Sequence, residues 1–213
     1  MISLLDQGLY TLFVLLAFAL VISLTFHEFG HALIAKRFGD DTAEKAGRLT
    51  LNPVAHIDIV GFLMVVFVGF GYAKPVPTNP RNYSRPSAEI WVAAAGPLMN
   101  LTLAMVTWNL YLLMAGLEVA FFKSEATLMF FLILARVNLL LMVFNLLPVA
   151  PLDGHYIAPY LLPESMRETF KRFNTQYGPM LLLALVLSSL FGFPVFSWVL
   201  GVGDTLLGLI SFF

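Results

Sequence analysis

Cysteine is absent from the 213-residue sequence, and charged side chains are scarce. The absence of cysteine excludes disulfides, thiolate zinc ligands and a cysteine nucleophile. Charged residues make up only 12% of the chain, and they form no basic patch of the kind that binds nucleic acid. Hydrophobic residues, in contrast, make up 59%, and the mean hydropathy is +0.85. This composition is typical of a polytopic membrane protein.

Three apolar runs, at residues 10–35, 89–117 and 128–147, are long enough to cross a bilayer as helices, which takes about 20 residues. The first run ends in no small-residue cleavage site, so we expect it to be a retained span rather than a signal peptide. The apolar region 179–213 is interrupted by Pro194 and is compatible with one span plus an interfacial helix or with two short spans. We therefore expect an all-α polytopic membrane protein with about four to six transmembrane helices, forming a single domain over residues 1–213.

The connection between the first two long runs combines short apolar and extended segments. Residues 59–70 are apolar but too short to cross, so we expect a short re-entrant or extended segment, near any active site that the first run carries. Residues 48–51 alternate as a short strand does, and the prolines within 74–77 favour extended backbone.

The basic residues predict an orientation in the membrane. Seven of the twelve Lys and Arg residues fall in the first long connection, and the positive-inside rule then places this connection and the third one in the cytoplasm. The N-terminus should accordingly lie outside, and an active site near the far end of the first run would lie towards the cytoplasmic side.

The motif His27-Glu28-Phe29-Gly30-His31 lies inside the first apolar run. Two histidines four residues apart share one helix face, where they can bind one Zn²⁺ with the intervening glutamate beside its bound water. Elsewhere such a motif is often only a surface helix, but burying three ionisable side chains in lipid is costly. We therefore interpret the motif as a metal site.

A catalytic zinc site uses three protein ligands and leaves a fourth position for water. Asp153 is our first candidate for the third ligand, because two prolines end the helix before it and the glycine after it permits a tight turn. An aspartate at this place is also typical of a helix cap. His56 and Asp58 are the competing ligands, although a turn with a satisfied polar pair accounts for them as well.

Several polar residues lie in the apolar runs or beside the motifs. Asn100 and Asn145 are candidate donors to a substrate carbonyl, and an interhelical hydrogen bond is the alternative for each. Arg136 needs a partner or an aqueous face, and we favour a structural role for it. His155 is expected to be interfacial, and the sequence leaves its role and that of His56 open.

Three motifs in order, HEFGH, AAAGPLMN and NLLPVAPLDG, resemble the site-2 protease family of intramembrane zinc metalloproteases. The stretches NPVAHID and YAKPVPTNPRNYS extend the resemblance to the small branch of the family that lacks a PDZ domain. The resemblance implies that His27, His31 and Asp153 bind one zinc ion per chain and that Glu28 is the general base. It also implies that Asn100 and Asn145 help to hold substrate and that residues 71–77 pair with an unwound substrate strand.

We therefore expect an intramembrane zinc endopeptidase that hydrolyses peptide bonds of membrane-anchored proteins, with water activated by Glu28 as nucleophile. The expected partners are a membrane protein or peptide substrate and the lipid bilayer, with no nucleic acid, and a homo-oligomer stays open. A non-catalytic metal-dependent scaffold would not need the free carboxylate of Glu28. A transporter would be expected to show related repeats, which the sequence lacks. A glutamate as third ligand is disfavoured, since no suitable motif follows Glu89, Glu118 or Glu125.

Overall fold

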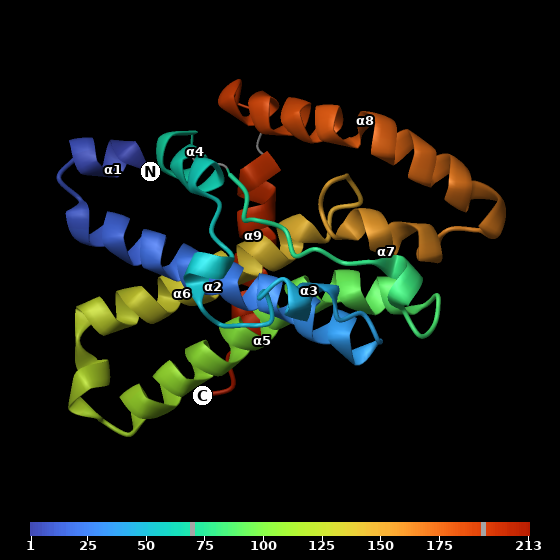
Figure 1. Ribbon diagram of the computed structural model, residues 1–213. Helices are drawn as coiled ribbons and strands as arrows, with labels where there is room; N and C mark the ends of the chain where they lie inside the picture. Colours follow the sequence, from blue (N-terminus) through green and yellow to red (C-terminus); the bar gives the residue numbers. More distant parts are fainter. Residues whose placement is uncertain (69–70, 193–194) are drawn as a thin grey trace.

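The computed structural model describes residues 1–68, 71–192 and 195–213, and this part of the chain is helical without strands (Figure 1). Its helices, including three short 3₁₀ turns, are α1 (Ile2–Asp6), α2 (Tyr10–Arg37), α3 (Thr42–Lys45), η1 (Pro53–Ala55), α4 (Ile59–Val68), η2 (Pro80–Asn82), α5 (Ala88–Gly116), η3 (Ala120–Lys123), α6 (Glu125–Asn145), α7 (Gly154–Leu161), α8 (Glu164–Leu190) and α9 (Val195–Leu209).

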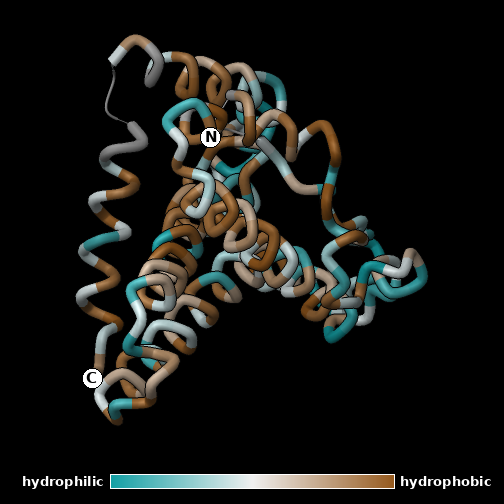
Figure 2. The backbone as a smooth tube through the Cα atoms, turned by 90° about the vertical axis from the view of Figure 1, so that its left-hand side faces the viewer, coloured by the Kyte–Doolittle hydropathy of each residue, from teal (hydrophilic) through white to brown (hydrophobic). Residues whose placement is uncertain are grey.

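Helices α2, α5 and α6 are long and apolar enough to cross a membrane, and they match the three predicted spans. They contain 28, 29 and 21 residues, and they pack against one another at the centre of the molecule (Figure 1). Figure 2 shows hydrophobic residues along these helices and more hydrophilic ones in the connections. The prediction of an all-helical integral membrane protein is confirmed.

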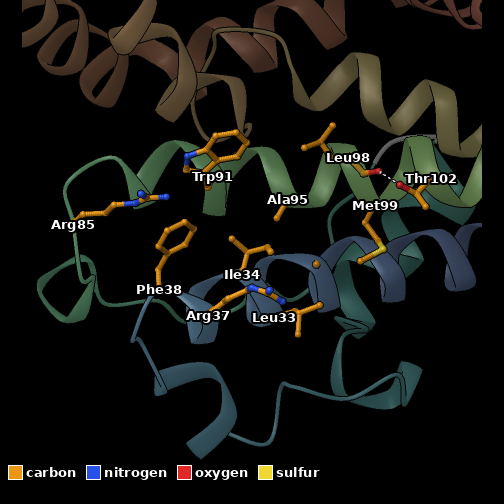
Figure 3. A pocket seen from close by; sticks show the side chains of 11 residues that line it. Leu33, Ile34, Arg37, Phe38, Arg85, Trp91, Ala95, Leu98, Met99 and Thr102 are labelled. Atoms are coloured by element: carbon orange, nitrogen blue, oxygen red, sulfur yellow. Dashed lines mark hydrogen bonds between the residues drawn. The ribbon is translucent and has the colours of Figure 1, made fainter.

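Helices α2 and α5 approach closely because small residues face each other where they cross. A Cβ atom added at Gly30 would lie 2.8 Å from the carbonyl oxygen of Ala95. Beside this contact, a cavity of about 370 Å³ opens between the two helices (Figure 3). Its lining is mostly apolar, and Arg37 and Arg85 are its charged members. The guanidinium carbon of Arg85 lies 4.8 Å from the ring centre of Phe38.

Two further helices complete the bundle near the C-terminus. Helix α9 packs on α5 and α6, and it is held at its end by a hydrogen bond from the Trp108 indole to Ser211 (2.8 Å). Helix α8 lies to one side of the bundle in Figure 1 and continues through Pro179. The region 179–213 therefore forms parts of two helices, and the residues between them, 193–194, lie outside the described part. The choice between one span and two stays open.

The connection from α2 to α5 corrects two predictions. Residues 59–68 form helix α4, which excludes the extended alternative, whereas a re-entrant segment stays a prediction; residues 69–70 lie outside the described part. Residues 48–51 form no strand, because Arg48 turns its backbone towards Ala43 and its side chain towards the segment 74–75. The segment 71–79 is neither helix nor strand, in keeping with its prolines.

A buried carboxylate fastens this connection to the end of α2. Asp40 accepts hydrogen bonds from the backbone and hydroxyl of Thr42, from the backbone N–H of Asn79 and from the amide of Asn82. Burial acts to raise the pKa of Asp40, but these hydrogen bonds outweigh it, so the pKa lies below its ordinary value. The segment that returns towards α5 is thereby tied to α2.

Candidate metal centre

Three side chains from distant parts of the sequence meet in the middle of the bundle. His27 and His31 project from one face of α2, and Asp153 reaches them from the turn before α7. The Nε2 atoms of the two histidines lie 3.1 Å apart. The carboxylate oxygens of Asp153 lie 3.2 Å from His27 Nε2 and 3.3 Å from His31 Nε2. Among the described residues, this group has its ligand atoms all within 4.8 Å of one another, as a metal site requires.

The hydrogen bonds behind the two rings fix which nitrogen faces the centre. His27 Nδ1 lies 2.6 Å from the amide oxygen of Asn100, and His31 Nδ1 lies 2.7 Å from the carbonyl oxygen of Val92. Both oxygens only accept hydrogen bonds, so each Nδ1 carries the proton and donates it. In the neutral rings, each Nε2 then turns a lone pair towards the centre.

Lone pairs from four atoms therefore converge, two from nitrogen and two from the Asp153 carboxylate. Such an arrangement is repulsive unless a cation lies between them. One carboxylate oxygen of Asp153 is buried without a hydrogen-bond partner, which is expected of an atom that ligates a metal. Two neutral imidazoles and one carboxylate are a ligand set that zinc uses in catalytic sites, so the residues present fit a zinc ion.

Asn100 orients His27 as part of a buried chain of amides. Its side chain is fully buried, and its amide nitrogen donates to the Ser23 carbonyl (3.1 Å) and to the Asn138 side-chain oxygen (2.8 Å). Asn138 in turn donates to the Leu134 carbonyl (2.8 Å). Because both amide hydrogens of Asn100 are used, its oxygen must face His27. This geometry supports the interhelical alternative for Asn100.

Helix α5 gives the two imidazoles room through a glycine. A Cβ atom at Gly96 would lie 2.5 Å from His27 Cε1, 2.6 Å from His27 Nε2 and closer still to His31 Nε2. The small residues of the AAAGP stretch thus allow α5 to pass directly behind the candidate ligands.

The turn that carries Asp153 is held by a side chain of α8. Asn174 accepts a hydrogen bond from the backbone N–H of Ala150 (2.8 Å) and donates one to the carbonyl of Pro148 (2.7 Å). The Asp153 side chain makes no capping hydrogen bond to α7, so it is free to face the histidines. Gly154 follows because a Cβ there would collide with the carbonyl oxygens of Leu146 and Leu147.

Glu28 lies on α2 between the two histidines and is buried. Its Oε2 accepts a hydrogen bond of 3.0 Å from the backbone N–H of Val76. Val76 stands between Pro75 and Pro77, neither of which has an N–H, so this amide is the single backbone donor of residues 75–77.

Arg48 holds the backbone that precedes that amide, and His56 lies behind Arg48. The Arg48 guanidinium, only 5% exposed, donates to the carbonyls of Pro75 (3.0 Å) and Lys74 (2.5 Å). Burial lowers the pKa of Arg48, and the negative charge of Glu28 opposes that shift. His56 is bound through both ring nitrogens, to Thr50 O (2.8 Å) and to Arg48 Nη2 (3.4 Å). His56 therefore does not join the three converging residues.

The remaining sequence candidates do not belong to the group of three converging side chains. Asn145 ends α6, and its amide donates to the carbonyl of Leu141 one turn earlier (2.9 Å). Arg136 has the partner that its position requires, because its Nε lies 2.9 Å from Asp204 of α9. His155 is buried and packs beside the rings of Tyr156 and Phe170, and its position at the membrane interface stays a prediction.

Glu89, one of the glutamates considered as a third ligand, is engaged by two other side chains. Tyr160 donates to its Oε2 (2.7 Å), and Lys171 lies 3.7 Å from the same oxygen. Burial, together with the hydrogen bond and the charge of Glu89, raises the pKa of Tyr160 to about 12. These contacts join α5, α7 and α8, so Glu89 has a structural role.

Sequence reasoning missed Asn174 and the amide of Val76, and it assigned Arg48 only to the basic residues of the connection and to a predicted strand. Asn174 has no signal in the sequence, because it lies among other polar residues of α8. The Pro-Val-Pro triplet does carry a signal, since it leaves one backbone donor in an otherwise donor-free stretch.

The fold and these converging side chains define an integral membrane protein with a candidate zinc site. Residues 15–128 and 117–188 match Peptidase family M50. The chain belongs to this family, the site-2 protease family, and is a zinc metalloprotease. It is 39% identical over 212 residues to "Putative zinc metalloprotease YwhC" of Bacillus subtilis, covering 97% of this chain and 96% of that one.

More distant relatives carry similar names. "Putative zinc metalloprotease Rip2" of Mycobacterium tuberculosis is 34% identical over 196 residues, which are 88% of this chain and 73% of the relative. "Putative zinc metalloprotease MJ0611" of Methanocaldococcus jannaschii is 30% identical over 134 residues, 62% of each chain. No solved structure gave a significant match. The resemblance to the site-2 protease family, inferred from three sequence motifs, is therefore confirmed.

Proposed function

We propose that this zinc metalloprotease cleaves peptide bonds of membrane-anchored proteins within or beside the bilayer. The observation that carries the proposal is the convergence of His27, His31 and Asp153 around one point, beside the buried carboxylate of Glu28. His27 and His31 belong to the candidate span α2, so the chemistry would take place at the depth of that helix.

His27, His31 and Asp153 would hold one zinc ion per chain. When bound, zinc lowers the pKa of a coordinated water to about 7 and polarises a carbonyl oxygen. The chain's own residues supply the rest. Asn100 and the Val92 carbonyl keep the two imidazoles in the tautomer that a metal needs, and Gly96 leaves them the space to turn inward.

Glu28 would act as general base. A buried carboxylate next to the ligands can accept a proton from the attacking water and pass it to the leaving amine nitrogen. One of its oxygens is engaged by Val76 N–H, which leaves the other for proton transfer. Asn145, at the end of α6, remains our candidate for contact with substrate backbone, and so does the irregular segment 71–77, to which an unwound substrate strand can add.

The basic residues support an active site on the cytoplasmic side. Arg37 ends α2 only six residues beyond His31, so at about 1.5 Å per residue the candidate ligands lie within about 10–15 Å of that helix end. The positive-inside rule assigns this end to the cytoplasm. In this proposal residues 1–213 form one domain, which is compatible with a monomer or a homo-oligomer.

The test is cleavage of a single-span protein co-reconstituted with the purified enzyme in liposomes, with the cut mapped by mass spectrometry. Wild type should cut within or next to the apolar segment. Glu28→Gln, which is nearly isosteric but cannot accept the proton, should keep zinc and lose about 10²–10⁴-fold in rate. Lys45→Gln, at an exposed ion pair with Asp41, is the matched control. Glu28→Gln that cuts at the wild-type rate with zinc bound would refute the proposal.

A further inference from the structure

The backbone N–H of Val76 bonds the carboxylate of Glu28, and this contact depends on residues far from the metal ligands. We propose that Arg48 and His56 are positioning residues, which hold the segment 74–76 so that the Val76 N–H orients Glu28. The inference rests on the proposed role of Glu28 as general base.

The first support is the way in which the segment is bound. Of its polar backbone groups, the N–H of Lys74 donates to the His56 carbonyl (2.9 Å), and the carbonyls of Lys74 and Pro75 accept from Arg48. The group that comes next along the chain is the Val76 N–H, and it points to Glu28. Fixing its neighbours on one side fixes the direction of this amide.

The second support is the charge and burial of Arg48. A guanidinium that is only 5% exposed has been removed from water at a cost, and one of its nitrogens, Nε, is buried without a hydrogen-bond partner. No acidic side chain forms an ion pair with Arg48 among the described residues. The guanidinium instead donates hydrogen bonds from its other two nitrogens to two backbone carbonyls. Its planar fork holds two donors in a fixed relative orientation, which the single ammonium of a lysine cannot do.

The third support is His56, which lies behind Arg48. The carbonyl of Thr50 accepts from Nε2, so the lone pair of Nδ1 is turned towards Arg48 Nη2 at 3.4 Å. The histidine thus accepts from the guanidinium on one side and is anchored on the other. A chain of contacts therefore runs from Thr50 through His56 and Arg48 to the backbone that bonds Glu28.

The consequence for the reaction is a carboxylate with one defined orientation. A general base that is displaced by about 1 Å can lose on the order of 100-fold in rate. Because the segment bonds Glu28 and none of the zinc ligands, its loosening should lower kcat without removing zinc.

The test compares Arg48→Gln and Arg48→Lys with Arg81→Gln, an exposed arginine of the same connection. We expect kcat to fall by about 10–100-fold in Arg48→Gln and less in Arg48→Lys, with a smaller change in KM than in kcat and with zinc content unchanged. Amide hydrogen exchange of residues 72–79 should become faster in both Arg48 variants and stay as in wild type for Arg81→Gln.

A second pair of variants addresses the amide itself. Val76→Pro removes the N–H, whereas Val76→Ala keeps it, so the kcat of Val76→Ala should lie much closer to wild type than that of Val76→Pro. This pair carries the test if Arg48→Gln fails to fold. His56→Gln should shift exchange and kcat in the same direction as Arg48→Lys.

Two results would overturn the inference. One is a kcat within twofold of wild type in Arg48→Gln and Val76→Pro. The other is a raised KM with unchanged kcat, which would assign the segment to substrate binding alone. If wild type fails to cleave, or Glu28→Gln cleaves as wild type does, the proposed function fails instead. Hydrogen exchange still reports in that case whether Arg48 holds the segment.

Discussion

Gly96→Ala perturbs the candidate zinc site without removing any of its ligands. The added methyl would lie 2.5 Å from His27 Cε1 and 2.6 Å from His27 Nε2, whereas ordinary contact begins at 3.4 Å. The imidazole must therefore retreat by roughly 0.8 Å, about four times the 0.2 Å latitude of zinc–ligand distances. Shifts of supporting groups typically cost 10–100-fold in metal affinity, so we expect at least about a tenfold weaker zinc site.

The measurement is zinc affinity by competition with a chelator, in detergent, for wild type and variant. Gly116→Ala is the matched control, because Gly116 lies on the same helix and has nothing within 4 Å of an added Cβ. The control should bind zinc as wild type does and gain slightly in helix stability, by up to about 1 kcal/mol. Wild-type affinity in Gly96→Ala, with helical content retained, would show that the imidazoles do not converge against α5 as described.

Three further predictions test the surroundings of the site. Asn100→Ala leaves the first histidine of the motif without its acceptor, so zinc affinity should fall by about 10–100-fold in the same competition assay; no change would contradict the role of the amide chain. Topology reporters inserted at Arg81 and Arg172 should be found on the cytoplasmic side of the membrane, and a reporter at Lys123 should be found outside. A reporter at Lys123 found on the cytoplasmic side would contradict this orientation. Because the pKa of Asp40 is lowered by its hydrogen bonds, its contribution to stability is present above about pH 4 and is lost as the pH falls. Thermal unfolding of wild type and Asp40→Ala should therefore converge in acid, and a constant difference would refute this assignment.

The spans, and the three side chains that converge in the structure, could be predicted from the sequence because both depend on local signals. An apolar run of the length of α2 has few alternatives to a membrane-crossing helix, and two histidines four residues apart share a face of any helix. Asp153 is predictable because prolines and a glycine around it force a turn, although only the structure shows that this N-cap residue makes no side-chain capping hydrogen bond.

Predictions from the sequence fail where contacts between distant residues determine the local structure. Residues 59–68 are helical because a helix satisfies the backbone N–H and C=O groups of an apolar segment internally, a preference that length alone did not reveal. The apparent strand at 48–51 fails because Arg48 is drawn to carbonyls 26 and 27 residues later. Asn174, which holds the turn before Asp153 from α8, depends on a packing that no local pattern encodes.

Asn100 and His56 also show that local sequence signals are insufficient without tertiary contacts. Each is a polar residue whose chemistry permits a ligand, substrate or structural role, and the sequence cannot choose among these roles. Three-dimensional partners decide between them: Asn100 faces His27, and His56 faces Arg48 and Thr50.

The zinc content of two purified variants tests most directly that His27, His31 and Asp153 form the metal site. Asp153→Ala leaves two histidines, which hold zinc poorly, so it should lose both bound zinc and cleavage. His56→Ala should retain about one zinc per chain, because both nitrogens of His56 are engaged away from the converging ligands. Zinc retained in Asp153→Ala and lost in His56→Ala would contradict the account and move the metal to the segment 52–58.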